Sequence, residues 1–79
     1  MNVKQKALDI IAKISGTEVS ELRNDMQLVG DLGIDSPRAL QLLVDLEEAL
    51  ELEISDDDAA KMDSVGDILD FLESVPQGA

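Results

Sequence analysis

One serine stands where the sequence could support chemistry. Ser36 follows Asp35 and precedes Pro37, at the junction of a long loop and a helical pattern. Serine followed by proline favours a helix start, because serine caps the first turn and proline lacks an N–H that the turn does not need. We predict that Ser36 caps this helix with an exposed hydroxyl, where free N–H groups and the helix dipole favour an anion.

The chain offers this serine no catalytic partner. It contains no Cys, His, Trp or Tyr, so disulfides, thiolate or imidazole metal sites and histidine-activated nucleophiles are excluded. Residues 33–37 read Gly-Ile-Asp-Ser-Pro and miss the G-x-S-x-G spacing of serine hydrolases. The acidic run at 56–58 lacks EF-hand spacing and is expected in the first turn of a helix. We therefore expect neither an enzyme nor a metal site.

The charge is strongly acidic and uneven. Eighteen acidic residues against six basic ones give a net charge of −12, and ten of the acids fall between residues 31 and 58, with Arg38 the one base there. Such a charge disfavours nucleic acid and anionic membranes, and it favours basic protein partners. A merely solvated acidic face remains the alternative. Self-repulsion predicts a monomer whose fold weakens at low ionic strength.

Length and composition indicate one small domain, residues 1–79. The chain is 44% hydrophobic, and its one aromatic residue is Phe71, so the core must be aliphatic. No apolar run approaches the roughly 20 residues that span a bilayer. The charged start of the chain does not resemble a secretory signal, so we expect a cytoplasmic protein.

Periodicity and capping residues predict the first two helices. Residues 3–15 show helical spacing of apolar side chains, with Asn2 and Gln5 as a capping box and Gly16 as a stop. Ser36 opens a second helix that should end near Glu51.

The remaining segments are shorter. Ser55 with Asp58, and Ser64 with Asp67, are capping patterns that predict a short third helix and a fourth. Between the first two helices, residues 16–35 should form a loop that packs across the bundle, with a helical turn near residues 18–22. Pro76 and Gly78 predict a frayed tail.

These residues resemble the acyl carrier protein family. The likeness is densest at residues 31–36, Asp-Leu-Gly-Ile-Asp-Ser, and covers nearly the whole chain. It continues through Leu42, Leu46, Glu47, Glu48, Glu53, Ile54, Lys61 and Val65. The resemblance implies an all-α fold: a small right-handed four-helix bundle with a long packed loop between helices I and II and a short helix III.

The same resemblance implies a function for the serine. A phosphopantetheinyl transferase would attach 4′-phosphopantetheine from coenzyme A to Ser36, with Asp35 assisting. The arm would supply the thiol that the chain lacks. Acyl intermediates of fatty acid or related lipid or polyketide biosynthesis would be bound to this thiol as thioesters. An unmodified acidic interaction module and an aminoacyl carrier remain alternatives.

The second helix also carries apolar residues off its main stripe. Leu40 and Val44 lie beside acidic residues and could form a small exposed apolar patch within an acidic rim. A broad core-facing stripe would also explain them. In the family, such positions contact basic-faced synthases, reductases and acyltransferases. The predicted docking residues are Pro37, Leu40, Gln41, Val44, Glu47 and Glu48.

Three positions depart from the family pattern. Pro37 replaces the usual leucine, while Arg38 and Gln41 stand where acids are common. These departures predict a specialised carrier that serves a dedicated pathway.

The resemblance also implies a channel for the acyl chain between helices II, III and IV, although an ordinary core would use the same residue types. The predicted lining is Leu28, Leu42, Leu46, Ile54, Ala59, Met62 and Ile68.

Overall fold

The computed structural model describes residues 2–74, so the tail predicted at Pro76 and Gly78 lies outside the described residues. Within residues 2–74 the secondary structure is helical, with one isolated bridge between Gln27 and Ser64. The elements are α1 (Val3–Ser15), a 3₁₀ turn η1 (Val19–Glu21), α2 (Ser36–Leu50), α3 (Asp56–Ala60) and α4 (Val65–Ser74). The predicted all-α fold with a short third helix is confirmed.

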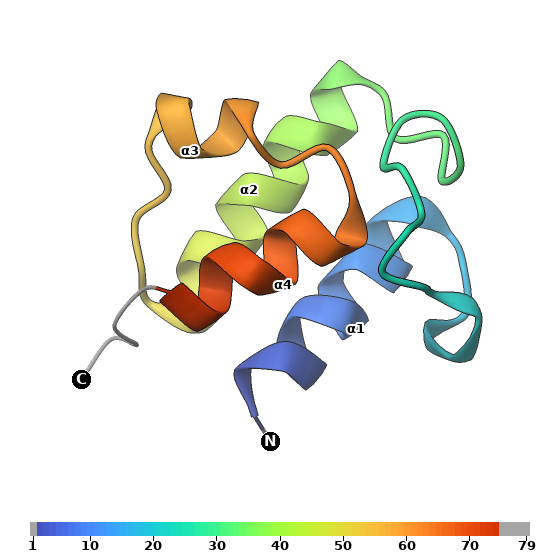
Figure 1. The fold of residues 1–79 in the computed structure, drawn as a ribbon, viewed down its shortest axis with the longest axis horizontal. Helices are drawn as coiled ribbons and strands as arrows, with labels where there is room; N and C mark the ends of the chain where they lie inside the picture. Colours follow the sequence, from blue (N-terminus) through green and yellow to red (C-terminus); the bar gives the residue numbers. More distant parts are fainter. Residues whose placement is uncertain (1, 75–79) are drawn as a thin grey trace.

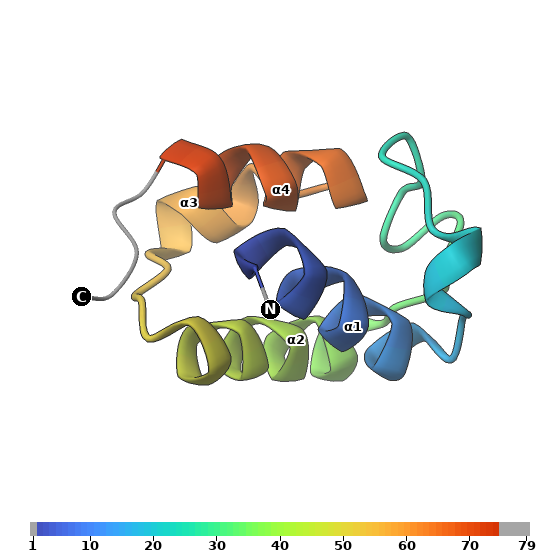
Figure 2. The ribbon, with the colours of Figure 1, turned by 90° about the horizontal axis from the view of Figure 1, so that it is seen from below.

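Helix α1 lies between α2 and α4 and packs against both (Figures 1 and 2). The core is aliphatic, as the composition predicts, and no polar or charged side chain among the described residues is buried. Its largest fully buried side chains are Ile11, Ile34, Leu42, Leu46, Val65 and Ile68. Burial of aliphatic surface is therefore the main force that holds the bundle together.

Capping residues set the ends of α1. Asn2 Oδ1 accepts a hydrogen bond from the N–H of Gln5 at 2.7 Å, as predicted. The reciprocal half of the capping box is wrong, because the Gln5 side chain donates instead to Asp9, one turn along the helix. Gly16 ends the helix with a left-handed φ of 74°, which glycine adopts without steric cost.

The two short helices also begin at the predicted caps. Ser55 Oγ accepts from the N–H of Asp58 at the start of α3. At α4, Ser64 and Asp67 form the full reciprocal capping box, with both backbone-to-side-chain distances at 3.1 Å. Local sequence therefore decides where α3 and α4 start.

The connection between α1 and α2, residues 16–35, packs against the bundle as predicted, with Leu28, Leu32 and Ile34 buried. It is also joined to the start of α4 by backbone hydrogen bonds, at the end of the bundle where Figure 1 shows it in cyan to green. The bonds are Leu28 N–H to Asp63 O, Val65 N–H to Met26 O and Gly66 N–H to Asn24 O, at 2.9 to 3.0 Å. These bonds fix the long connection in place.

Candidate functional site

Ser36 is the first residue of α2, and its side chain is exposed. Its hydroxyl has no hydrogen-bond partner within residues 2–74. The prediction that Ser36 itself caps the helix is wrong. Asp35 is the cap, and its Oδ1 accepts from the N–H of Arg38 at 3.0 Å. An aspartate cap places the serine one position into the helix, where its Oγ is left free.

The expectation of several free N–H groups for an anion at this helix start is also wrong. Pro37 has no N–H, and those of Arg38 and Ala39 are bound to Asp35. In the first turn, as far as the described residues show, the N–H of Ser36 remains available. A phosphodiester at Ser36 would therefore depend on the helix dipole and on water more than on a cradle of amides.

The turn before Ser36 holds the chain in position. Ile34 is fully buried, and its N–H donates to the carbonyl of Leu28 at 2.9 Å. Gly33 takes a φ of 66°, a left-handed conformation that glycine adopts at no steric cost. The serine is thus exposed two residues after a buried anchor, which fixes its place without covering it.

The outer face of α2 carries most of the predicted docking residues. Leu40 is 64% exposed and Val44 is 38% exposed. The alternative that both belong to a core-facing stripe is therefore wrong. Pro37, Gln41 and Glu48 are exposed beside them. Large exposed aliphatic side chains within an acidic surface are typical of a contact surface for another protein.

Glu47 differs from the other five predicted docking residues. It is half-buried, and its Oε2 accepts from the N–H of Ile54 at 2.9 Å, across the connection between α2 and α3. Its backbone carbonyl also accepts from the N–H groups of Glu51 and Leu52. Nothing in the sequence indicated this contact, because it joins residues seven apart through the shape of a loop.

The structure brings six of the seven predicted channel residues together in one aliphatic cluster, which does not include Ala59. Ile54 is half-buried and packs against the core, and Ala59 is half-buried on α3. The buried members of the set are Leu28, Leu42, Leu46, Met62 and Ile68. A channel at this place stays a prediction, with Ile54 at its edge.

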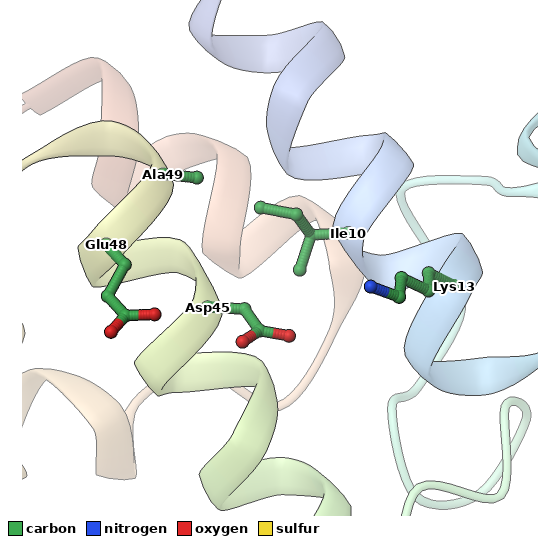
Figure 3. A pocket seen from close by; sticks show the side chains of 5 residues that line it. All are labelled: Ile10, Lys13, Asp45, Glu48 and Ala49. Carbon is green, nitrogen blue, oxygen red and sulfur yellow. The ribbon is translucent and has the colours of Figure 1, made fainter.

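A groove that the sequence did not predict lies between α1 and α2 (Figure 3). It has a volume of about 360 Å³, and the side chains of Lys13 and Asp45 face each other across it. Ile10, Glu48 and Ala49 complete the lining. Of these five residues only Glu48 was a predicted site residue, because the groove depends on how the two helices pair.

Charges on the described surface are mostly unpaired with one another. The one ion pair in residues 2–74 joins Arg23 and Asp25 at 3.3 Å, both exposed, so it adds little stability. Asp56, Asp57 and Asp58 occupy the first turn of α3, as predicted. No helix in the described part of the chain is long and apolar enough to cross a membrane.

Known proteins match this chain over nearly its full length. The family profile "Phosphopantetheine attachment site" matches residues 5–72. The acyl carrier protein of Desulforapulum autotrophicum is 38% identical over 73 residues, covering 91% of this chain and 95% of the relative. That of Clostridium acetobutylicum is 35% identical over 72 residues, with coverage of 91% and 94%.

Two solved structures share the fold. A Mycobacterium tuberculosis protein assigned as an acyl carrier protein superposes with a TM-score of 0.83 at 29% identity, covering 91% of this chain and 96% of its own. The acyl carrier protein of Enterococcus faecalis gives a TM-score of 0.74 at 27% identity, with coverage of 94% and 98%. Such proteins are carriers rather than enzymes, and the exposed hydroxyl at the start of α2 fits their covalent arm. This chain belongs to the acyl carrier protein family, whose prosthetic group is a covalently attached 4′-phosphopantetheine.

Proposed function

We propose that Ser36 is the attachment residue, and that the chain carries acyl intermediates in fatty acid or related lipid or polyketide biosynthesis. The observation that carries this proposal is the exposed, unbonded hydroxyl of Ser36 at the start of α2. The arm would supply a thiol for thioester formation. The chain itself supplies an exposed oxygen, on a residue that directly follows the buried Ile34 and the Asp35 cap.

Asp35 has two roles in this proposal. It holds the first turn of α2 by capping it, and its exposed carboxylate, whose Oδ1 binds the Arg38 amide, lies next to the hydroxyl in sequence. In this position it would assist the phosphopantetheinyl transferase when the arm is attached. An asparagine would keep a capping oxygen and lose the charge, so Asp35→Asn separates the two roles.

Acyl-processing enzymes with basic faces would dock on the outer face of α2. Leu40 and Val44 would provide apolar contact, while Glu48 and its acidic neighbours would speed encounter. The same 79 residues would act as a single carrier domain, since α1, α2, α4 and the connections that flank α2 and α3 contribute to one core cluster.

The attachment test is the mass of the intact protein after co-expression with a phosphopantetheinyl transferase. The wild-type chain should gain the mass of one phosphopantetheine, and Ser36→Ala should gain none. Ser20→Ala is the matched control, because Ser20 is also exposed but lies in η1, away from a long-helix start. Modification of Ser36→Ala would mean that the arm is attached elsewhere, and no gain with any of several transferases would favour the unmodified interaction module.

We further propose that this carrier serves a dedicated pathway. Pro37, Arg38 and Gln41 are all exposed, so their departures from the family pattern alter what a partner meets near Ser36. General fatty-acid synthase enzymes should therefore turn over its acyl form slowly, and Arg38→Glu with Gln41→Glu should raise the rate. Turnover equal to that of a housekeeping carrier would contradict this.

A further inference from the structure

One acidic side chain binds the backbone of the connection between α2 and α3. Glu47 Oε2 accepts from the backbone N–H of Ile54 at 2.9 Å, and this is a partly buried contact. Ile54 packs its side chain against the core cluster. The carboxylate therefore fixes the backbone of a residue that was predicted to line the channel.

Glu47 also belongs to the face that partners would meet. It lies one turn from Val44 and two turns from Leu40 along α2, and it is only half-buried, so part of the residue meets solvent. A carboxylate accepts more strongly from a cationic donor than from a neutral amide. A lysine or arginine brought beside Glu47 would compete with the N–H of Ile54 for the same oxygens.

We propose that Glu47 is a latch that couples docking to release of the cargo. In the free carrier its carboxylate holds Ile54 over the channel edge; when a cationic partner side chain takes that carboxylate, the connection at residues 51–55 is freed to open. This inference rests on the proposed docking face and channel. Glu47 acts through Ile54 and is a positioning residue.

The neighbouring acid provides a contrast within the same helix. Glu48 is exposed and carries the same charge, and its side chain makes no hydrogen bond or ion pair with the described residues. Loss of charge at either position should weaken partner encounter to a similar degree. Only loss of the carboxylate at position 47 should loosen Ile54.

Amide hydrogen exchange of the apo protein tests the latch directly. The Ile54 amide should exchange about tenfold faster in Glu47→Ala, the loss expected for one hydrogen bond to a charged acceptor. Glu47→Gln keeps an acceptor oxygen and should stay near wild type, as should Glu48→Ala. The amide of Leu46, within α2, reports global unfolding. Equal acceleration at Leu46 and Ile54, or none at Ile54, would overturn the latch.

A cationic probe tests the coupling. Tetra-arginine peptide should accelerate exchange at Ile54 in the wild-type protein and in Glu48→Gln. It should do so much less in Glu47→Gln, whose neutral amide attracts no cation. An unchanged Ile54 amide in wild type at saturating peptide, or an equal response in Glu47→Gln, would refute the coupling.

Cargo release gives the final readout. With an octanoyl group on the arm, hydroxylamine should cleave the thioester faster in Glu47→Ala than in Glu47→Gln or Glu48→Ala. Equal rates in all three would contradict a role for Glu47 in covering the chain. Mass gain at Ser36 is measured on the same samples, so failure of the latch is distinguishable from failure of the carrier function.

Discussion

The two connections that flank α2 are built in opposite ways. The long connection, residues 16–35, buries three aliphatic side chains and exchanges three backbone hydrogen bonds with the start of α4. The short connection, residues 51–55, has no buried residue; its backbone is held by Glu47 and begins at Glu51 in a left-handed conformation. The firmly held long connection positions Ser36, whereas the more exposed short one contains Ile54, a residue predicted to line the channel.

The largest expected effect comes from removing one isoleucine from each connection. Ile34 is fully buried, so Ile34→Ala should lower the free energy of unfolding by about 2–5 kcal/mol through lost burial and the cavity it leaves. Ile54 is half-buried and its site can relax, so Ile54→Ala should cost about 1 kcal/mol. Urea titration of both variants measures the difference. Equal losses would show that the two connections are equally firm.

The next effect concerns the seam, which is the set of three backbone hydrogen bonds that join residues 24–28 of the long connection to residues 63–66 at the start of α4. A Cβ on Gly66 would lie 2.9 Å from the backbone oxygen of Asn24, so one of the two segments must move. Gly66→Ala should therefore cost about 1–3 kcal/mol of stability, as overpacking usually does, despite the higher helix propensity of alanine.

Gly30→Ala is the control for this substitution, because Gly30 lies in the same connection and its Cβ would meet only Gln27 Cβ at 3.6 Å. Its free energy of unfolding, measured by urea titration, should stay within about 0.5 kcal/mol of the wild-type value. If Gly66→Ala leaves the free energy of unfolding unchanged and the seam amides stay protected from exchange, the backbone of the long connection shifts more easily than its contacts indicate.

Sequence patterns predicted the parts of this molecule that are local. The caps at Asn2, Ser55 and Ser64 and the stop at Gly16 were all readable, because each depends on residues within one turn. The cap of α2 was placed one residue late, since both Asp35 and Ser36 are good caps and the buried position of Ile34 decides between them.

Contacts between distant segments could not be predicted in this way. The bond from Ile54 to Glu47 and the groove between α1 and α2 depend on loop shape and helix pairing, and neither leaves a periodic trace. Val29 shows the same limit: it is an apolar residue of the connection that was predicted to pack, yet it is 71% exposed. Composition indicates that a loop packs without indicating which of its side chains face inward.

Charge repulsion should act on the whole molecule, and most on its loose parts. With 18 acidic residues against six basic ones, a rise from 10 mM to 150 mM salt shortens the screening length from about 30 to about 8 Å. Stability should rise by about 1 kcal/mol, or about 4–8 °C in Tm for a domain of this size. Exchange in residues 51–55 should slow more than at the seam. A Tm independent of salt and Mg²⁺ would contradict the repulsion.

The smallest expected effect lies at the end of α2. Glu51 has a φ of 54°, a conformation that costs a residue with a Cβ about 1 kcal/mol and costs glycine almost nothing. Glu51→Gly should therefore raise the free energy of unfolding by about 0.5–1 kcal/mol, even though glycine adds flexibility to the unfolded chain. Glu51→Ala removes the same charge and keeps the strain, so it isolates the conformational part. If both variants gain equally in urea titrations, charge relief explains the gain, and the short connection is loose without being strained.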